Sequence, residues 1–163
     1  MSAKAVIFDL DDTLVDTRAL REFRESRSWR EAVAQARKSS LFPGIADLLS
    51  RLATQRVSIA VVTTSVSYYA AAVLKHHAIS PHVLIAYHDA PRKPRPDPVI
   101  LALERLKLKA SDVIGVGDSV VDCTAYRAAK VHSVGAVWSP VFSVSDWQTL
   151  AREPMHVADL CVS

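Results

Sequence analysis

Residues 5–13 read AVIFDLDDT, and they set the fold class of this 163-residue chain. The stretch opens with four apolar residues in an unbroken run, as expected of a strand that is covered on both faces. The run stops at a group of carboxylates, Asp9, Asp11 and Asp12. Unpaired charge is costly to bury, so these acids are expected where a ligand or solvent can reach them. The stretch therefore predicts a buried strand with a polar site at its carboxyl end.

Further apolar runs of this kind follow along the chain, separated by stretches with helical spacing. One such stretch places Ile45, Leu48, Leu49 and Leu52 on a single helix face. Strands that alternate with helices predict an α/β fold with a doubly wound, mainly parallel, five-stranded sheet and right-handed crossovers. The predicted strands are Ala5–Leu10, Val57–Thr64, Val83–Tyr87, Val113–Gly117 and Ser133–Trp138, and the other predicted helices are Val66–His77, Asp97–Leu106 and Val120–Lys130.

The segment Val15–Phe42 interrupts this alternation. It contains no strand-like run, whereas Trp29, Ala32, Val33 and Ala36 follow the i, i+3, i+4, i+7 spacing of a helix. We expect two short helices inserted after the first strand, at about residues 16–42. The length of the chain suits one domain, spanning residues 1–163, with this insert as its only elaboration.

Composition restricts the functional class without naming a function. Half of the residues are hydrophobic and 23% are charged, as in globular proteins. No apolar run approaches the roughly 18–20 residues of a membrane span, so no membrane partner is expected. The only cysteines are Cys123 and Cys161, which excludes a disulfide framework and favours a cytoplasmic location. The net charge of +3 is compatible with an anionic substrate and does not by itself indicate nucleic-acid binding.

Polar side chains follow the predicted strands, near the points where the strands end. The second strand ends in Thr63 and Thr64, and the fourth leads into GDSVVD, which contains Asp118 and Asp122. RKPRPDP, with Lys93, begins a few residues after the third strand. Ligands of a doubly wound sheet bind beyond the carboxyl ends of its strands. Because buried charge is expensive unless it is paired, such a convergence of acids, hydroxyls and a lysine indicates a functional site.

Four elements, FDLDDTLVDT, the threonine pair, KPRPDP and GVGDSVVD, resemble in order the signature motifs of the haloacid dehalogenase-like superfamily. The resemblance extends from Ala5 to about Trp138, and the lead-in LFPG at residues 41–44 is similar to the phosphoglycolate phosphatase branch. It implies a Rossmann-like core and a phosphoric monoester hydrolase that uses Mg²⁺ and an aspartyl-phosphate intermediate. Dehalogenating members lack an acid at the position of Asp11, so its presence favours phosphoryl transfer.

The resemblance implies a role for each acid of the motifs. Asp9 corresponds to the nucleophile, and Asp11 to the general acid/base that protonates the leaving oxygen and then activates water. Asp118 is expected to bind Mg²⁺ together with Asp9 and the backbone carbonyl of Asp11. Asp122 is expected to orient this metal site, directly or through water. Elementary chemistry agrees, because an anionic nucleophile needs positive charge to approach a phosphate and Mg²⁺ prefers oxygen ligands.

Phosphate binding is expected from the two middle motifs. Thr63 corresponds to a residue that donates to a phosphoryl oxygen, and Lys93 to one that holds both the nucleophile and the transferring group. Thr64 stands where relatives often carry asparagine, so fine placement of the phosphate is expected to differ. Arg92 and Arg95 flank the motif lysine and are further candidates for substrate contacts.

Several of these features also have a purely structural explanation. The acids of DLDDT are suited to capping a turn, Lys93 to a solvated loop, and Asp122 to the first turn of a helix. The insert also contains an arginine at every third position. Each step advances about 300° around a helix, so the series spirals and is typical of a solvated surface, although arginines also pair well with phosphates. These residues are Arg18, Arg21, Arg24, Arg27 and Arg30.

The insert is about half as long as the helical cap that closes over small substrates in this branch. The site is therefore expected either to stay open to a large phosphorylated partner or to receive a lid from a neighbouring subunit of a homo-oligomer. The leading hypothesis is a phosphatase for a small metabolite or nucleotide. The alternatives are a phosphatase for a macromolecule, such as a nucleic-acid end or a phosphoprotein, a non-catalytic binding module, and a phosphomutase.

Overall fold

A computed structural model describes residues 2–162 of the chain. Its main sheet has six strands in the order β5-β4-β1-β6-β7-β8, and every neighbouring pair is parallel. The prediction of an α/β, doubly wound sheet is confirmed, but the expected number of five strands was wrong. The additional strand, β8, has only three residues and no apolar run that would reveal it. The strands are β1 (Ala5–Phe8), β4 (Ser58–Val62), β5 (Val83–Ile85), β6 (Val113–Gly117), β7 (His132–Ala136) and β8 (Thr149–Ala151).

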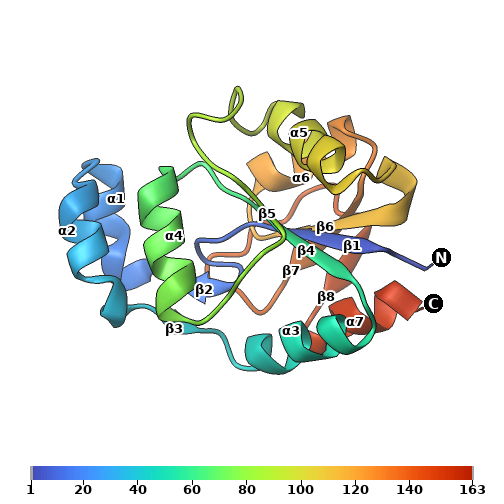
Figure 1. The fold of residues 1–163 in the computed structure, drawn as a ribbon, viewed down its shortest axis with the longest axis horizontal. Coiled ribbons are helices and arrows are strands. Elements are labelled where there is room, and N and C mark those ends of the chain that lie inside the picture. Colours follow the sequence, from blue (N-terminus) through green and yellow to red (C-terminus); the bar gives the residue numbers. More distant parts are fainter. Residues whose placement is uncertain (1, 163) are drawn as a thin grey trace.

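Helices cover both faces of the sheet (Figure 1). Side chains alternate along a strand, so Val6 and Phe8 of β1 pack into one core and Ala5 and Ile7 into the other. The first core also contains α3, α4 and α7, and the second contains α5 and α6. None of the helices in residues 2–162 has the length and apolar character needed to cross a membrane. The helices that cover the sheet are α3 (Ile45–Thr54), α4 (Ser67–His76), α5 (Asp97–Leu106), α6 (Val120–Ala128) and α7 (Met155–Val162).

The segment between β1 and α3 forms a small lobe beside α4 (Figure 1). The two short helices expected there, α1 (Arg21–Glu25) and α2 (Trp29–Ala34), are present. The expectation that the segment contains no strand was wrong, because β2 (Val15–Asp16) and β3 (Ser40–Leu41) pair in antiparallel fashion where the lobe begins and ends. Strands of two residues are too short to produce a sequence pattern.

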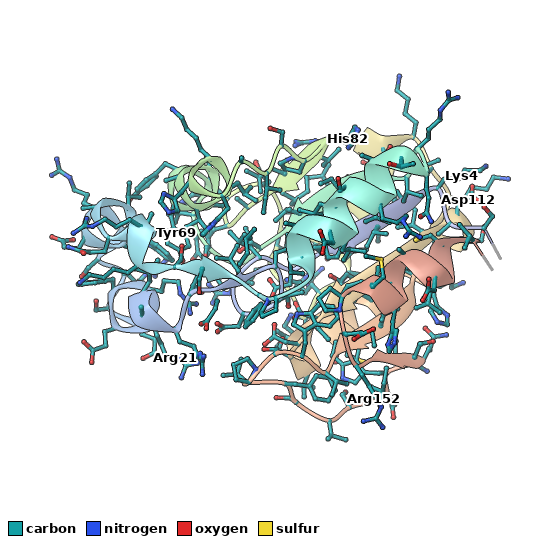
Figure 2. The ribbon with its side chains drawn as sticks, turned by 90° about the horizontal axis from the view of Figure 1, so that it is seen from below. Lys4, Arg21, Tyr69, His82, Asp112 and Arg152 are labelled. Atoms are coloured by element: carbon teal, nitrogen blue, oxygen red, sulfur yellow. The ribbon has the colours of Figure 1, made fainter. Side chains whose placement is uncertain are left out.

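The lobe is anchored to the core through aromatic side chains. Trp29 of α2 packs against Tyr69 of α4, with ring centroids 5.2 Å apart. Figure 2 shows Tyr69 among the elements of the lobe end of the molecule, with Arg21 on the same end, whereas the ion pair of Lys4 and Asp112 lies at the opposite end. The lobe therefore lies at the end of the molecule opposite the Lys4–Asp112 ion pair.

The strand order places the carboxyl end of β1 at the centre of the sheet. The chain adds β4 and β5 on one side of β1 and then returns to add β6, β7 and β8 on the other side. Phe8, the last residue of β1, pairs with Val61 of β4 and with Val116 of β6. Such a switch point is where ligands bind in doubly wound sheets. The motifs that follow these strands are thus brought to one edge.

Candidate active site

A tight turn follows β1 and carries the acids of the first motif. The backbone N–H of Asp9 still donates to the carbonyl of Val116 at 3.0 Å, which keeps Asp9 in register with the sheet. Asp12 then adopts the left-handed conformation with φ 64°, which aspartate tolerates better than most residues. The carbonyl of Leu10 accepts hydrogen bonds from three successive backbone N–H groups, those of residues 13–15. The DLDDT stretch is therefore a fixed loop with its carboxylates outward from the strand.

Lys93 lies at the centre of the site. Its side chain is 2% exposed, and its Nζ donates to Asp9 Oδ1 at 3.2 Å, to Asp122 Oδ1 at 2.5 Å and to the carbonyl of Val62 at 2.9 Å. Burial alone favours the neutral amine, but Asp122 and Asp9 outweigh it and raise the pKa of Lys93. Lys93 is therefore a buried, charged group in contact with Asp9, and not a solvated loop lysine.

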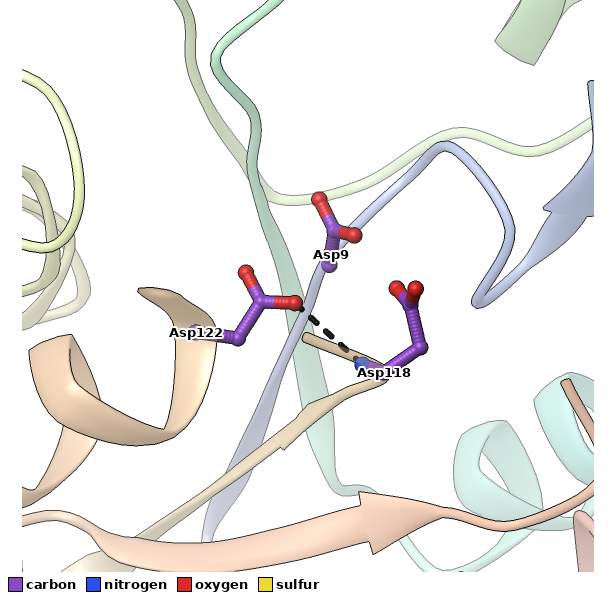
Figure 3. Close-up of side chains that lie close together, drawn as sticks. All are labelled: Asp9, Asp118 and Asp122. Atoms are coloured by element: carbon purple, nitrogen blue, oxygen red, sulfur yellow. Dashed lines mark hydrogen bonds between the residues drawn. The ribbon is translucent and has the colours of Figure 1, made fainter. Parts of the chain in front are cut away.

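Asp118 and Asp122 complete an acidic cluster with Asp9 (Figure 3). One oxygen from each of the three carboxylates lies within 4.8 Å of the others. Asp122 Oδ2 accepts from the backbone N–H groups of Asp118 and Ser119, both at 3.2 Å, and from Ser119 Oγ at 2.9 Å. Ser119 in turn caps α6 by accepting from the backbone N–H of Asp122. Asp122 is therefore committed to Lys93 and to the loop at the start of α6.

The electrostatics of this cluster fit a divalent cation. Burial, the Asp122 charge and that of Asp118 raise the pKa of Asp9, against the opposing effect of Lys93. Burial and Asp122 likewise raise the pKa of Asp118 to about 7. The surroundings of both carboxyls therefore contain too little positive charge for them to ionise as readily as they would in water. Mg²⁺ prefers oxygen ligands, which are the donor atoms that these three carboxylates supply.

Asp11 is turned away from this cluster toward the lobe. Its Oδ1 accepts from Thr17 Oγ1 at 2.8 Å and from Tyr69 OH at 2.7 Å, and its Oδ2 accepts from Ser65 Oγ at 2.7 Å. The guanidinium of Arg24 lies 3.6 Å from Oδ1. None of these four partners was predicted to contact Asp11. Ser65 precedes α4 and Tyr69 lies within it, and only the fold shows that both meet Asp11.

The remaining predicted site residues differ in their location. Thr63 is buried at the end of β4, and its Oγ1 accepts from the backbone N–H of Ser65 at 3.1 Å, which leaves its own hydrogen available. Thr64 and Arg92 line a cavity next to Lys93. Arg95 is not brought there, since its side chain is 67% exposed and pairs with Asp97 at 2.9 Å. Thr13, which sequence reasoning did not assign, donates to Asp118 Oδ1 at 2.8 Å.

The cavity beside the acids lies between the lobe and the carboxyl end of the sheet. It measures about 390 Å³, within the usual range for small-molecule sites. The core side contributes Thr64, Tyr87, Arg92 and Lys93, and the lobe contributes residues 24, 25, 27 and 29. The site is thus a shallow hollow formed by two parts of the chain, with the acidic cluster next to it.

Comparison with known proteins agrees with this arrangement. A phosphoglycolate phosphatase from Pectobacterium atrosepticum is 37% identical over 103 residues, covering 61% of this chain and 44% of that protein. The phosphoglycolate phosphatase of Escherichia coli K12 is 34% identical over 101 residues, covering 60% of this chain and 40% of that protein. The chain therefore matches less than half the length of these curated relatives.

A solved structure shares the fold over nearly the whole chain. CbbY from Rhodobacter sphaeroides, in complex with phosphate, superposes with a TM-score of 0.78 at 20% identity, covering 95% of this chain and 96% of that chain. The family model for haloacid dehalogenase-like hydrolases matches residues 21–136, a span that includes the second, third and fourth motifs. With the ordered motifs, the sheet and the family match in agreement, this chain belongs to the haloacid dehalogenase-like hydrolase family.

Proposed function

We propose that this protein is a Mg²⁺-dependent phosphatase that hydrolyses small phosphate monoesters through an aspartyl-phosphate on Asp9. One observation carries the proposal. Asp9 contacts the buried charge of Lys93 and shares an acidic cluster with Asp118, a carboxyl whose pKa is raised to about 7. This arrangement suits an anionic nucleophile that must approach an anionic phosphate, because Lys93 and a bound cation would offset the negative charge of both groups.

The reaction has two steps. The Asp9 carboxylate attacks phosphorus, forming an oxygen–phosphorus bond while the bond from phosphorus to the leaving oxygen breaks, and Asp11 gives that oxygen a proton. Water then attacks phosphorus, Asp11 takes the proton from the water, and the bond to Asp9 breaks to release phosphate. Lys93 and Thr63 hold phosphoryl oxygens in both steps. A divalent ion held by Asp9, Asp118 and the backbone carbonyl of Asp11 would neutralise charge on the phosphoryl group.

The other polar residues of the site position these groups. Asp122 fixes Lys93 and the backbone of Asp118 at once. Thr17, Ser65 and Tyr69 hold the Asp11 carboxyl in one orientation. The cavity of about 390 Å³ beside Lys93 supports a small phosphorylated substrate over a macromolecular one.

Hydrolysis of 4-nitrophenyl phosphate tests this proposal. We expect turnover that requires Mg²⁺ and stops in excess EDTA. Asp9→Asn should abolish it, and Asp11→Asn should lower kcat by about 10²–10⁴-fold, the usual contribution of a general acid/base. Asp47→Asn, on the exposed face of α3, is the matched control and should retain full activity. Acid-quenched wild-type protein should carry phosphate on the peptide that contains Asp9. Full activity in Asp9→Asn, or in the presence of the chelator, would contradict the mechanism.

A further inference from the structure

The cavity next to the proposed phosphoryl site carries more positive charge than a phosphoryl group alone requires. Besides Lys93, it is lined by Arg24 and Arg27 from the lobe and by Arg92 from the loop after β5. Of the five regularly spaced lobe arginines, Arg24 and Arg27 lie in the cavity lining, whereas Arg18 pairs with Asp16 at 2.8 Å. The periodic series is therefore mostly solvated surface, with two members directed to the site.

Arg27 and Arg92 are held together without a carboxylate partner. Their guanidinium carbons lie 5.3 Å and 5.4 Å from the centroid of the same Tyr87 ring, and Arg92 also donates to Tyr87 OH at 3.1 Å. Hydrogen bonding and charge from Arg27, followed by the charge of Arg92, lower the pKa of Tyr87. Within residues 2–162, no acid lies within ion-pair distance of either arginine, although Glu25 also lines the cavity. Two like charges on one ring are unfavourable unless an anion joins them.

Arg24 also lines the cavity and, unlike Arg27 and Arg92, has carboxylates within ion-pair distance. Its side chain is only 18% exposed, and its Nε is buried without a hydrogen-bond partner among the described residues. Its nearest carboxylates, Asp11 and Asp12, lie at 3.6 Å and 3.7 Å, beyond good hydrogen-bond length. Arg24 therefore adds a further positive charge to the cavity wall, partly offset by these two acids.

We propose that this cavity is a subsite for a second anionic group of the substrate, a carboxylate or another phosphate, separate from the group that is hydrolysed. The inference rests on the proposed function and extends it from phosphate monoesters in general to those with a second negative charge. Guanidinium groups bind carboxylate and phosphate through paired hydrogen bonds, so Arg27 and Arg92 would provide most of the recognition. Phosphate esters whose distal group is neutral would leave the two arginines unpaired, and a distal ammonium group would be repelled.

A set of two-carbon phosphate esters tests this inference. The substrates are 2-phosphoglycolate, ethane-1,2-diol bisphosphate, ethyl phosphate and phosphoethanolamine, which differ mainly in the charge of the distal group. We expect kcat/KM to be at least about tenfold higher for an ester with a second anion than for ethyl phosphate, and lowest for phosphoethanolamine. The comparison of the first two substrates shows whether carboxylate or phosphate is preferred.

Variants locate this preference in the cavity. Arg27→Gln and Arg92→Gln should each reduce the ratio of kcat/KM between the preferred dianionic ester and ethyl phosphate by about tenfold or more. Arg30→Gln, an exposed lobe arginine outside the cavity lining, is the matched control and should keep the wild-type ratio. Circular dichroism of each variant checks that the fold is retained. An unchanged ratio in both cavity variants would overturn the inference.

The outcomes separate this inference from the proposed function. Asp9-dependent hydrolysis without any preference for a second anion would overturn the subsite and leave the phosphatase intact. If no ester is hydrolysed, calorimetric binding of the stable analogues phosphonoacetate and ethylphosphonate still decides the subsite. Tighter binding of phosphonoacetate that is lost in Arg27→Gln would support it, and equal binding of the two analogues would overturn it.

Discussion

At the residue scale, Asp122 shows how one carboxylate serves several neighbours. One of its oxygens pairs with Lys93, and the other caps the backbone at the start of α6. The sequence left open whether this acid orients a metal site or favours a helix terminus. In the structure, the Oδ2 that caps the start of α6 also accepts from the backbone N–H of Asp118, one of the candidate metal ligands. Gly117 is required here, since a Cβ at that position would lie 2.6 Å from Asp122.

The raised pKa of Asp118 predicts a pH dependence of stability. In the unfolded chain this carboxyl titrates near its ordinary value of about 3.9, whereas in the folded, metal-free protein its pKa is about 7. Between these values the folded state binds more protons, so the contribution of Asp118 to the free energy of unfolding falls as pH rises, by at most about 1.4 kcal/mol per pH unit. Below about pH 4 both states are protonated and this loss disappears.

Urea unfolding in EDTA at several pH values measures this effect. The free energy of unfolding of the wild type minus that of Asp118→Asn should decrease between pH 4 and pH 7. Asp118→Asn also removes the negative charge that helps to raise the pKa of Asp9, and this change lowers the difference over the same pH interval. A difference that stays constant or increases over this interval would show that the carboxyl is not destabilised by its surroundings.

At the scale of elements, the fold depends on a strand and a helix that the sequence patterns did not reveal. β8 extends the sheet beyond β7, and α7 packs against α3 over the core that contains β1. Ala158 and Cys161 of α7 are buried in that core. A helix of eight residues with a weak polar face gives little periodic signal, and its partner α3 lies about a hundred positions away in the chain.

Charge placed on α7 tests its contribution. Val157 is fully buried, so Val157→Asp should lower the free energy of unfolding by about 3–5 kcal/mol, the cost of an uncompensated buried charge. The same change at Val162, which is 62% exposed on the same helix, should alter it by no more than about 0.5 kcal/mol. Both values come from urea unfolding monitored by circular dichroism. Equal effects at the two positions would mean that α7 does not pack as described.

At the scale of the whole molecule, the site joins parts of the chain that are distant in sequence. Asp9, Lys93 and Asp118 follow β1, β5 and β6. Asp9 and Lys93 donate to backbone carbonyls of neighbouring strands, and the backbone N–H of Asp118 donates to the Asp122 side chain. An ion bound among these acids would link the two halves of the sheet across its switch point. Ligand binding to the folded state alone raises global stability.

Magnesium should therefore stabilise the entire fold. At pH 8 the free energy of unfolding of the wild type should rise with Mg²⁺ concentration, by about 2.7 kcal/mol when the ion is at 100 times its Kd. Asp118→Asn, which removes one of the two carboxylate ligands, should show a much smaller rise at the same concentrations. NaCl of equal ionic strength controls for general salt effects. An equal rise in the wild type and the variant would contradict a site at these acids.

The ordered motifs and the alternation of apolar strands with amphipathic helices determined the fold class and the set of acids and lysine that meet at the sheet edge. Those features are local, because the apolar pattern of a strand and the spacing of a motif depend on residues that are close together in the sequence. Only the tertiary structure decided that Thr13, Thr17, Ser65, Tyr69 and Arg24 surround the acids, that Arg92 faces the cavity while Arg95 pairs with Asp97, and that β8 and α7 complete the layers. These contacts join residues from separate elements. Their partners are set by packing across the whole fold, which no local pattern specifies.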